Sequence, residues 1–279
     1  MIDLHTHTTA SDGRLAPADL VARAAAAGVT VLAVTDHDTI GGCDAAAAAC
    51  AASGVEFVPG IEITAVMASA DVHVLGYFFD IQSRPLLEFL GEQRLTRIER
   101  VRQIVAKLAK LGVTLDADAI VQPALDDPRK SAGRPWIARA LVRSGQALST
   151  DDAFERWLGR GRAAFVPRLG APPGEVFERI HDAGGIASLA HPGLAAHDER
   201  IDGFVASGLD AIEAYHSRHD GATTARYVAM AKRLGIAVSG GSDFHADESH
   251  GPSAPGIVSL PRPEYERLVR LKPDATIDS

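Results

Sequence analysis

The first twelve residues constrain the chain more than any other stretch. A short strand-like segment, residues 1–4, leads directly into His5-Thr6-His7, and Asp12 follows in the turn marked by Ser11 and Gly13. Residues two apart in an extended backbone point to the same face of a strand. His5 and His7 can therefore present two imidazoles to one ion, although a single His-x-His pair is a weak signal by itself.

Helical and strand-like segments alternate in the two outer parts of the chain. Apolar runs between turn signals predict buried strands, and Ala-rich or amphipathic runs bounded by Pro and Gly predict helices. The predicted strands cover residues 30–35, 57–60, 61–64, 72–77, 186–190, 210–214, 236–240 and 256–260. The predicted helices cover 17–27, 40–53, 173–183, 199–206, 222–234 and 263–271. This alternation is typical of a mostly parallel sheet or barrel with helices outside.

The pattern changes in the middle of the chain. One long helix is predicted over 86–112, shorter helices over 117–122, 135–144 and 151–158, and strand signals return only at 164–167. We therefore expect an all-helical insertion over residues 91–165 within an α/β unit made of residues 1–90 and 166–279. Glu92 and Glu99 are interleaved with the basic residues of the long helix, which favours a solvated face over an RNA-binding one. These basic residues are Arg94, Arg97, Arg100, Arg102, Lys107 and Lys110.

Composition and charge narrow the class of protein. The 279 residues carry a net charge of −8, so no overall basic field attracts nucleic acid, although a bound metal can supply local positive charge for a nucleotide.

Cys43 and Cys50 lie about 10 Å apart on one predicted helix, too far for a disulfide. The sequence shows neither a signal peptide nor an apolar run of membrane-spanning length, so we expect a soluble cytoplasmic protein without a membrane partner. It indicates no oligomeric state.

Side chains that can bind metals follow most of the predicted strands. The carboxyl ends of parallel strands form the working surface of α/β folds, so these side chains should meet there. Imidazoles mixed with carboxylates suit divalent Zn, Mn or Fe better than Ca or Mg. Any one histidine is more often structural than a ligand, but their recurrence favours a multi-metal site in which Glu62 could bridge two ions. The residues are His5, His7, Asp36, His37, Glu62, His73, His191, Asp243 and His245.

Together these motifs resemble those of the PHP (polymerase and histidinol phosphatase) family of the amidohydrolase superfamily. The matching segments are His5-Thr6-His7 with Asp12, Thr35-Asp36-His37, Gly60-Ile61-Glu62, His73 to Tyr77, Ala190-His191-Pro192 and Gly241 to His245. The resemblance implies a distorted (β/α)7 barrel with two or three divalent ions, manganese foremost and zinc or iron as alternatives. It also implies one ligand group of His5, His7, Glu62 and Asp243, a second of Glu62, His73 and His191, and a third of Asp12, His37 and His245.

A segment of the insertion narrows the resemblance to one branch. Gly133-Arg134-Pro135-Trp136-Ile137-Ala138 is similar to a Gly-Arg-Pro-His-Ile-Ala motif of the branch that hydrolyses 3′,5′-bisphosphonucleotides and short oligoribonucleotides, with Trp136 where that motif has His. The branch implies a metal-dependent phosphatase that removes the 3′-phosphate of a nucleotide such as adenosine 3′,5′-bisphosphate and leaves a 5′-monophosphate. A 5′→3′ exoribonuclease acting on short RNA, a histidinol-phosphate phosphatase and a non-catalytic metal-binding scaffold stay open as alternatives.

Cationic and aromatic residues outside the ligand groups are the candidates for substrate contacts. Arg134 is expected to bind phosphate from an insertion that covers the active site, and Arg218 from the loop after the strand at 210–214. Three histidines are candidates for proton donation or substrate contact, namely His197, His216 and His219. Three aromatic residues could stack on a base but more commonly belong to a core, namely Trp136, Trp157 and Phe165.

Overall fold

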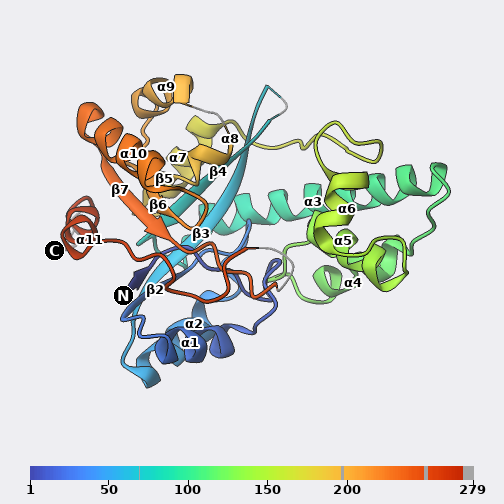
Figure 1. Cartoon of the computed structure of the whole chain (residues 1–279), viewed down its shortest axis with the longest axis horizontal. Coiled ribbons are helices and arrows are strands. Elements are labelled where there is room, and N and C mark those ends of the chain that lie inside the picture. The colour runs from blue at the N-terminus through green and yellow to red at the C-terminus, as the bar shows by residue number, and fades with distance from the viewer. Residues whose placement is uncertain (69, 196–197, 248–250, 273–279) are drawn as a thin grey trace.

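The computed structural model contains one seven-stranded sheet whose spatial order follows the chain order, as Figure 1 shows. It describes residues 1–68, 70–195, 198–247 and 251–272. The backbone N–H of Leu4 donates to the carbonyl of Gly240 at 3.2 Å, which brings the first strand beside the last and nearly closes the sheet into a barrel. The strands are β1 Ile2–Asp3, β2 Val31–Val34, β3 Glu56–Met67, β4 Ala70–Tyr77, β5 Ile186–Leu189, β6 Ala211–His216 and β7 Ala237–Gly241.

One strand departs from the parallel arrangement that the alternation predicts. β4 runs antiparallel to both β3 and β5, whereas the other neighbouring pairs within the sheet are parallel. Only two residues separate Met67 from Ala70, and a parallel pair needs a crossover connection of about a dozen residues or more. The short connection therefore forces a hairpin, and the barrel is distorted as the family resemblance implies.

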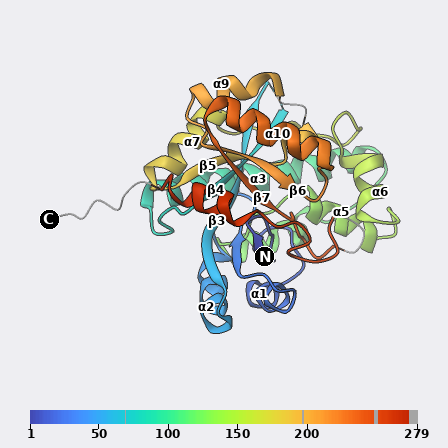
Figure 2. The same ribbon diagram turned by 60° about the vertical axis from the view of Figure 1, so that its left-hand side comes forward.

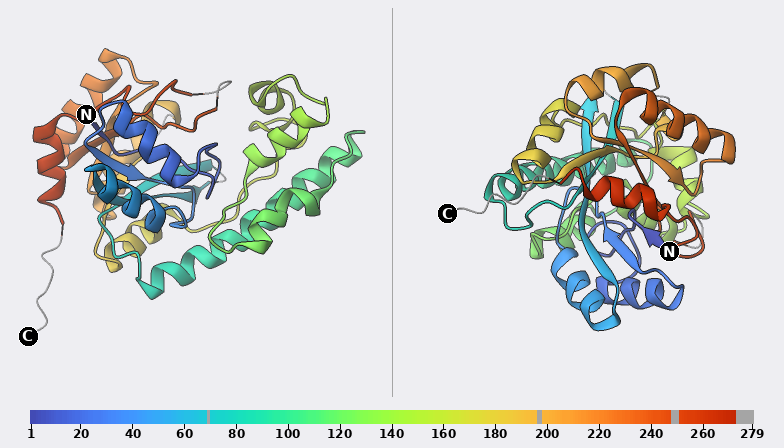
Figure 3. Two further views of the ribbon diagram at one scale, coloured as in Figure 1. Left: turned by 90° about the horizontal axis from the view of Figure 1, so that it is seen from below. Right: turned by 90° about the vertical axis from the view of Figure 1, so that its left-hand side faces the viewer.

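Helices cover the outside of the barrel. Figures 2 and 3 show α9 and α10 on one side of the strands and α1 and α2 on the opposite side. Local signals define their ends: in α10, Asp220 caps the first turn by accepting from the N–H of Thr223, and Gly235 ends the helix in a left-handed conformation. These helices are α1 Pro17–Ala26, α2 Cys43–Ser53, α7 Pro173–Asp182, α8 Pro192–Ala195, α9 Ile201–Ala206, α10 Gly221–Leu234 and α11 Arg262–Val269. The predicted α/β barrel is thus confirmed.

A helical lobe extends from the barrel on α3 (Figure 3). Buried residues of α3 recur every three or four positions; those as far as Leu90 join the barrel core, and those from Ile98 onward join a second core in the lobe. The lobe therefore packs around apolar side chains of its own and shares one helix with the barrel. Its elements are α3 Arg84–Lys110, α4 Ala117–Asp126, α5 Arg134–Arg143, α6 Thr150–Ala153 and the π-helical turn Phe154–Leu158.

Two predicted strands are loops. Residues 164–167 lead back to the barrel and end in a proline, and their carbonyls bind side chains: Arg100 donates to the Val166 carbonyl and Lys107 to that of Phe165. Residues 256–260 meet β1 at Leu260, whose N–H donates to the carbonyl of Ile2, but β1 is too short to form a ladder there. Among the described residues, no helix combines the length and apolar character that crossing a membrane requires.

Candidate metal centre

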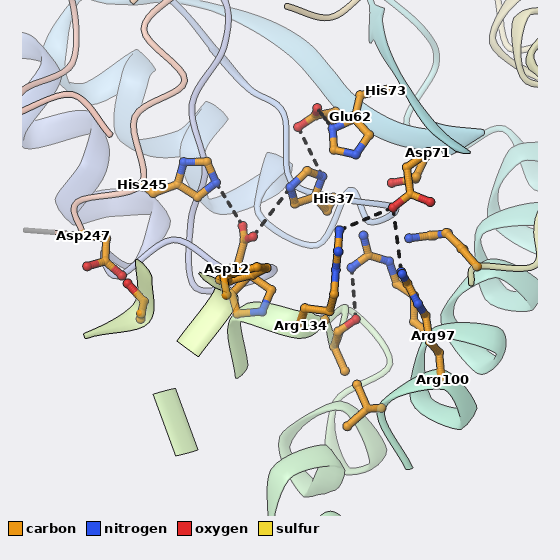
Figure 4. A pocket seen from close by; sticks show the side chains of 18 of the residues that line it. Asp12, His37, Glu62, Asp71, His73, Arg97, Arg100, Arg134, His245 and Asp247 are labelled. Atoms are coloured by element: carbon orange, nitrogen blue, oxygen red, sulfur yellow. Dashed lines mark hydrogen bonds and ion pairs between the residues drawn. The ribbon is translucent and has the colours of Figure 1, made fainter. Parts of the chain in front are cut away.

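The nine residues that the family resemblance implies as metal ligands meet at one end of the barrel. Asp36, which the strand pattern also suggested, instead accepts hydrogen bonds from Thr8 and Ser11. The nine residues lie in the loops that follow β1, β2, β5 and β7 and within β3 and β4. Figure 4 shows five of them, with the carboxylate of Asp12 between His37 and His245, and Glu62 between His37 and His73. Strand ends thus bring together side chains that are up to about 240 residues apart in the chain.

The first ligand group contains three fully buried residues, His5, His7 and Glu62, and the partly exposed Asp243. The Nε2 atoms of His5 and His7 both lie 3.2 Å from Oε2 of Glu62, and 3.3 and 3.2 Å respectively from Oδ1 of Asp243. Four ligands placed about 2.0–2.1 Å from an ion in a tetrahedron would be about 3.3 Å from one another. The spacing of this group therefore matches a site for a first-row divalent ion.

Glu62 connects this group to a second one. Its Oε2 faces His5 and His7 and also lies 3.2 Å from Nδ1 of His37, whereas its Oε1 lies 2.6 Å from Nδ1 of His73 and 3.2 Å from Nε2 of His191. The two carboxylate oxygens thus point to different sets of imidazoles. This arrangement suits a carboxylate that bridges two ions.

The third group surrounds Asp12. Its Oδ1 lies 3.3 Å from Nε2 of His245 and 3.8 Å from Nδ1 of His7, and its Oδ2 lies 3.6 Å from Nε2 of His37. His7 therefore joins the three residues that the sequence places here, because its second ring nitrogen faces Asp12. His37 likewise faces Glu62 with one nitrogen and Asp12 with the other.

Unpartnered ring atoms show that these residues fit metal ions. Both ring nitrogens of His7 and Nδ1 of His37 are buried. Among the described residues, carboxylate oxygens lie 3.2–3.8 Å from these nitrogens but not in hydrogen-bond geometry. Buried polar atoms without partners are uncommon, since each costs about 1–3 kcal/mol. Coordination of divalent ions would satisfy them.

The carboxylates set the charge of the cluster. Burial raises the pKa of Glu62, but the imidazoles of His37 and His73 hold it well below its usual range, and Asp243 and Asp12 behave likewise. Burial lowers the pKa of His7, but the carboxylates of Asp243 and Glu62 outweigh the effect of burial and raise this pKa to about 10. For His37, burial dominates and lowers the pKa to about 3. The ionised carboxylates favour cations, and a metal bound through His7 must displace a proton.

Close backbone approaches shape the cluster. A Cβ at Gly13 would lie 2.4 Å from the carbonyl oxygen of His7, and one at Gly241 would lie 2.3 Å from the backbone nitrogen of His5. Two of the predicted ligands have positive φ angles, 27° at His191 and 59° at Asp243. Strained backbone of this kind occurs where surrounding structure holds a side chain in a required place.

Glu213 is a buried acidic residue that the sequence analysis missed. Its Oε1 accepts from Nδ1 of His5 at 2.8 Å, and its Oε2 accepts from the backbone N–H of His191 at 2.7 Å. It therefore lies behind two predicted ligands and orients them, as carboxylates behind metal-binding histidines commonly do. The signal was a single carboxylate in the apolar run that forms β6, Ala211–His216.

A cavity of about 400 Å³ opens from the ligand cluster toward the insertion. Four arginines line its other end, namely Arg97, Arg100, Arg134 and Arg168. Arg97 and Arg100 belong to the helix face that the sequence analysis took to be solvated. That interpretation is wrong for Arg97, only 8% exposed, and for the largely buried Arg100. The middle of α3 thus supplies two of the cations that line the cavity.

Two carboxylates pair with these arginines. Asp38 accepts from Nε of Arg97 at 2.6 Å and from Nη2 of Arg168, and Asp71 lies 3.4 Å from Nη2 of Arg134 and 3.9 Å from Nη1 of Arg100. Burial and the nearby guanidinium of Arg134 lower the pKa of Arg100 to about 9. Four cations against two carboxylates leave this end of the cavity with an excess of positive charge.

The other predicted substrate contacts lie elsewhere. Arg218 is exposed and lines a second cavity, of about 700 Å³, rather than the one the ligands line. The buried ring of His216 lies behind Asp243, with 3.4 Å between Nε2 and Oδ2. Nδ1–H of His219 donates to the Ala214 carbonyl, 3.0 Å away. His197 lies outside the described residues.

The aromatic candidates have mixed outcomes. Trp136 and Trp157 pack against the core of the lobe, and the guanidinium of Arg134 lies 5.9 Å from the centre of the Phe165 ring. Phe154, which the sequence analysis did not select, lines the main cavity and also stacks with Arg134. It is therefore the aromatic residue best placed to meet a bound molecule.

Comparisons with known proteins agree with this geometry. The model of the PHP domain matches residues 3–113. A 5′-3′ exoribonuclease of Haemophilus influenzae is 38% identical over 87% of this chain and 89% of its own length. A 3′,5′-nucleoside bisphosphate phosphatase of Chromobacterium violaceum is 34% identical over 96% of both chains.

A solved structure has the same fold over nearly the whole chain. An amidohydrolase of Chromobacterium violaceum with bound sulfate superposes with a TM-score of 0.83 at 33% identity, covering 96% of both chains. Identity above 30% across almost the full length, together with a shared barrel, is enough to assign the family. The chain therefore belongs to the PHP family of metal-dependent phosphoesterases, in the branch that its bisphosphate-phosphatase and exoribonuclease relatives represent.

Proposed function

We propose that the protein is a metal-dependent phosphatase that removes the 3′-phosphate of a 3′,5′-bisphosphonucleotide, such as adenosine 3′,5′-bisphosphate, and leaves a nucleoside 5′-monophosphate. One observation carries this proposal: a single cavity has the metal-ligand cluster at one end and four arginines at the other. A bisphosphorylated nucleotide presents two anionic groups that need separate cationic partners. The name of the Chromobacterium violaceum relative supports the same substrate class.

The arginine end would hold the phosphate that is not cleaved. Nη2 of Arg100 is buried and has no hydrogen-bond acceptor among the described residues, so it has a donor free for a ligand. Arg134 reaches the same cavity from the start of α5. Guanidinium groups bind phosphate through paired N–H donors, which fixes its orientation as well as its position. Phe154 beside Arg134 offers an apolar face for the nucleoside.

The ligand cluster would hold two or three divalent ions, with manganese foremost. His5, His7, Glu62 and Asp243 would hold the first ion; Glu62, His73 and His191 the second; and Asp12, His37 and His245, with His7 beside them, the third. Bound divalent ions would supply Lewis acidity and a water activated near neutral pH. The carboxylate of Asp71 lies between His73 and the arginines and partly balances the positive charge of the arginines.

The exoribonuclease is the second candidate. It is favoured by the Haemophilus influenzae relative, whose name carries that activity, and it would use the same cavity to hold a 5′-phosphate while a phosphodiester bond is hydrolysed. Histidinol phosphate has one phosphate group and would leave the arginine end without a ligand. A non-catalytic metal-binding scaffold would use the ligand cluster but would not need the four arginines at the other end of the cavity.

The products formed from three substrates separate these functions, measured as inorganic phosphate for the two phosphatase activities and as released nucleoside 5′-monophosphate for the exoribonuclease. Manganese-loaded protein is assayed with adenosine 3′,5′-bisphosphate, a short 5′-phosphorylated RNA and histidinol phosphate. We expect the first to give adenosine 5′-monophosphate and phosphate at the highest kcat/KM. Absence of turnover of the bisphosphate would refute the phosphatase proposal, and unchanged activity in His7→Ala or Glu62→Ala would refute catalysis at this cluster.

A pair of arginine variants tests the role of the arginine end. Arg100→Met removes a donor from the cavity, whereas Arg102→Met on the same helix removes an arginine that pairs with exposed Asp118. A charged hydrogen bond contributes about 1.5–3 kcal/mol, so Arg100→Met should lower kcat/KM for the bisphosphate about 10- to 100-fold. The loss should be smaller with adenosine 3′-monophosphate. Equal losses with both nucleotides would contradict binding of the second phosphate at this end.

A further inference from the structure

The insertion holds the loop that carries Asp12 by its backbone. Three consecutive carbonyls of this loop accept hydrogen bonds from the insertion. The bonds run from the N–H of Ser131 to Ala10 (2.8 Å), from Nε1 of Trp136 to Ser11 (2.7 Å) and from Nη1 of Arg139 to Asp12 (3.0 Å). Two of the donors are side chains one turn apart on α5, so a single helix fixes the end of the loop.

The barrel holds the other end of the same loop. The carboxylate of Asp36 accepts from the N–H of Thr8 at 2.8 Å, from its hydroxyl at 2.6 Å and from the hydroxyl of Ser11 at 2.6 Å. These bonds fix the loop as far as Ser11. Past Asp12 the N–H of Arg14 donates to the His245 carbonyl at 2.9 Å, and the Ser11 hydroxyl lies 3.3 Å from Oδ1 of Asp12. The bond to the Asp12 carbonyl itself comes from Arg139, so the position of this residue also depends on how α5 lies against the loop.

We propose that Trp136 and Arg139 are positioning residues that determine how tightly the ligand group around Asp12 holds its ion. The inference rests on the metal centre proposed above. Asp12 is the one carboxylate in that group, whose other members are His7, His37 and His245. Groups that orient a ligand typically change metal affinity about 10- to 100-fold when removed. The insertion would thereby control one ion while the barrel alone holds the others.

The residue that departs from the family motif has a specific use in this arrangement. The indole Nε1–H of Trp136 is a donor in every protonation state of the protein, whereas a histidine ring nitrogen donates only in the right tautomer or charge state. Arg134 lies two positions earlier on α5 and lines the cavity. One rigid helix therefore faces both the substrate cavity and the loop of the third ligand group.

Paired variants of the full chain test this inference. Trp136→Phe and Arg139→Met each remove one donor. Two variants serve as controls. Trp157→Phe changes a lobe tryptophan whose buried Nε1 has no hydrogen-bond partner among the described residues, and Arg143→Met changes an exposed arginine of α5. Manganese bound per chain is measured by elemental analysis after gel filtration, and affinities by calorimetric titration with MnCl2.

We expect Trp136→Phe and Arg139→Met to retain about one ion fewer than the two controls, or to bind their weakest ion at least about 10-fold less tightly. Asp12→Asn should lose the same ion, and adding Trp136→Phe to it should cause no further loss. Wild-type content and affinity in both variants, or loss of every ion, would overturn the inference. Circular dichroism shows whether each variant is folded. If Trp136→Phe does not fold, the result for Arg139→Met decides the outcome. A wild-type chain that binds no manganese would instead overturn the proposed metal centre.

Discussion

Replacement of Glu213 by glutamine tests the orientation of the first ligand group. Glu213 is fully buried and uses one oxygen for Nδ1 of His5 and the other for the N–H of His191, at 2.8 and 2.7 Å. Burial raises its pKa, but His5 and His216 outweigh this effect and lower it, so the carboxylate is ionised at neutral pH. Glutamine keeps the shape but has one oxygen only. Its NH2 group must then face one of the two donors.

The size of the effect follows from these two contacts. A hydrogen bond to a charged group contributes about 1.5–3 kcal/mol, and a neutral one about 1 kcal/mol. Glu213→Gln converts one charged bond into a neutral bond and replaces the other by two donors that face each other. The sum is about 2–5 kcal/mol, which corresponds to about a 30- to 4,000-fold loss of metal affinity at His5.

A competition titration measures this loss. Wild-type protein, Glu213→Gln and the exposed control Glu266→Gln, in α11, compete with a fluorescent chelator for Mn²⁺ at pH 7.5. The control should match the wild-type protein. An affinity of Glu213→Gln within about twofold of the wild-type value would refute the argument, because the two bonds of Glu213 would then contribute nothing to the geometry of the ligands.

Three further predictions concern stability and metal content. Asp38→Asn should lower the free energy of unfolding of metal-free protein by about 3–5 kcal/mol, because it leaves Arg97 and Arg168 buried without their carboxylate. Those arginines outweigh burial and depress the folded-state pKa of Asp38 below its unfolded value of about 3.9. The difference in unfolding free energy between the wild-type protein and Asp38→Asn should therefore persist from pH 7 to about pH 4 and shrink at lower pH. A constant difference down to pH 2 would contradict this prediction. Chelator treatment should lower the melting temperature, and excess Mn²⁺ should restore it. Restoration should be weaker at pH 6 than at pH 8, because His7, with a pKa of about 10, must lose a proton to bind the ion. Equal restoration of the melting temperature at the two pH values would contradict this prediction. Gly13→Ala should lower metal content, because its Cβ would lie 2.4 Å from the His7 carbonyl oxygen. Gly203→Ala in α9, where no atom lies within 4 Å, should not; equal metal content in both would count against the close approach.

Local signals account for the parts of the fold that the sequence predicts well. Apolar runs between turns place β2, β5, β6 and β7 within one or two residues, and capping signals do the same for most helices. Most of the predicted ligands share this property, since they follow or lie within a strand that is recognisable by itself, whereas Asp12 lies in the loop after β1. The meeting of His5, His7, His37, His191, Asp243 and His245 follows from the rule that parallel strand ends lie at one face. His73 joins them from the antiparallel β4, which this rule does not predict.

The sequence by itself determined an α/β barrel with a helical insertion and nine candidate ligands, because periodicity, turn residues and motif spacing act over short stretches of chain. Only the tertiary structure decided what surrounds those ligands. Asp38 meets Arg97 and Arg168, which lie 59 and 130 residues away, and Glu213 meets His5 across 208 residues. A charged side chain on a predicted helix or strand can be solvated or buried, and its distant partner decides between the two, since burial of a charge is costly unless it is paired.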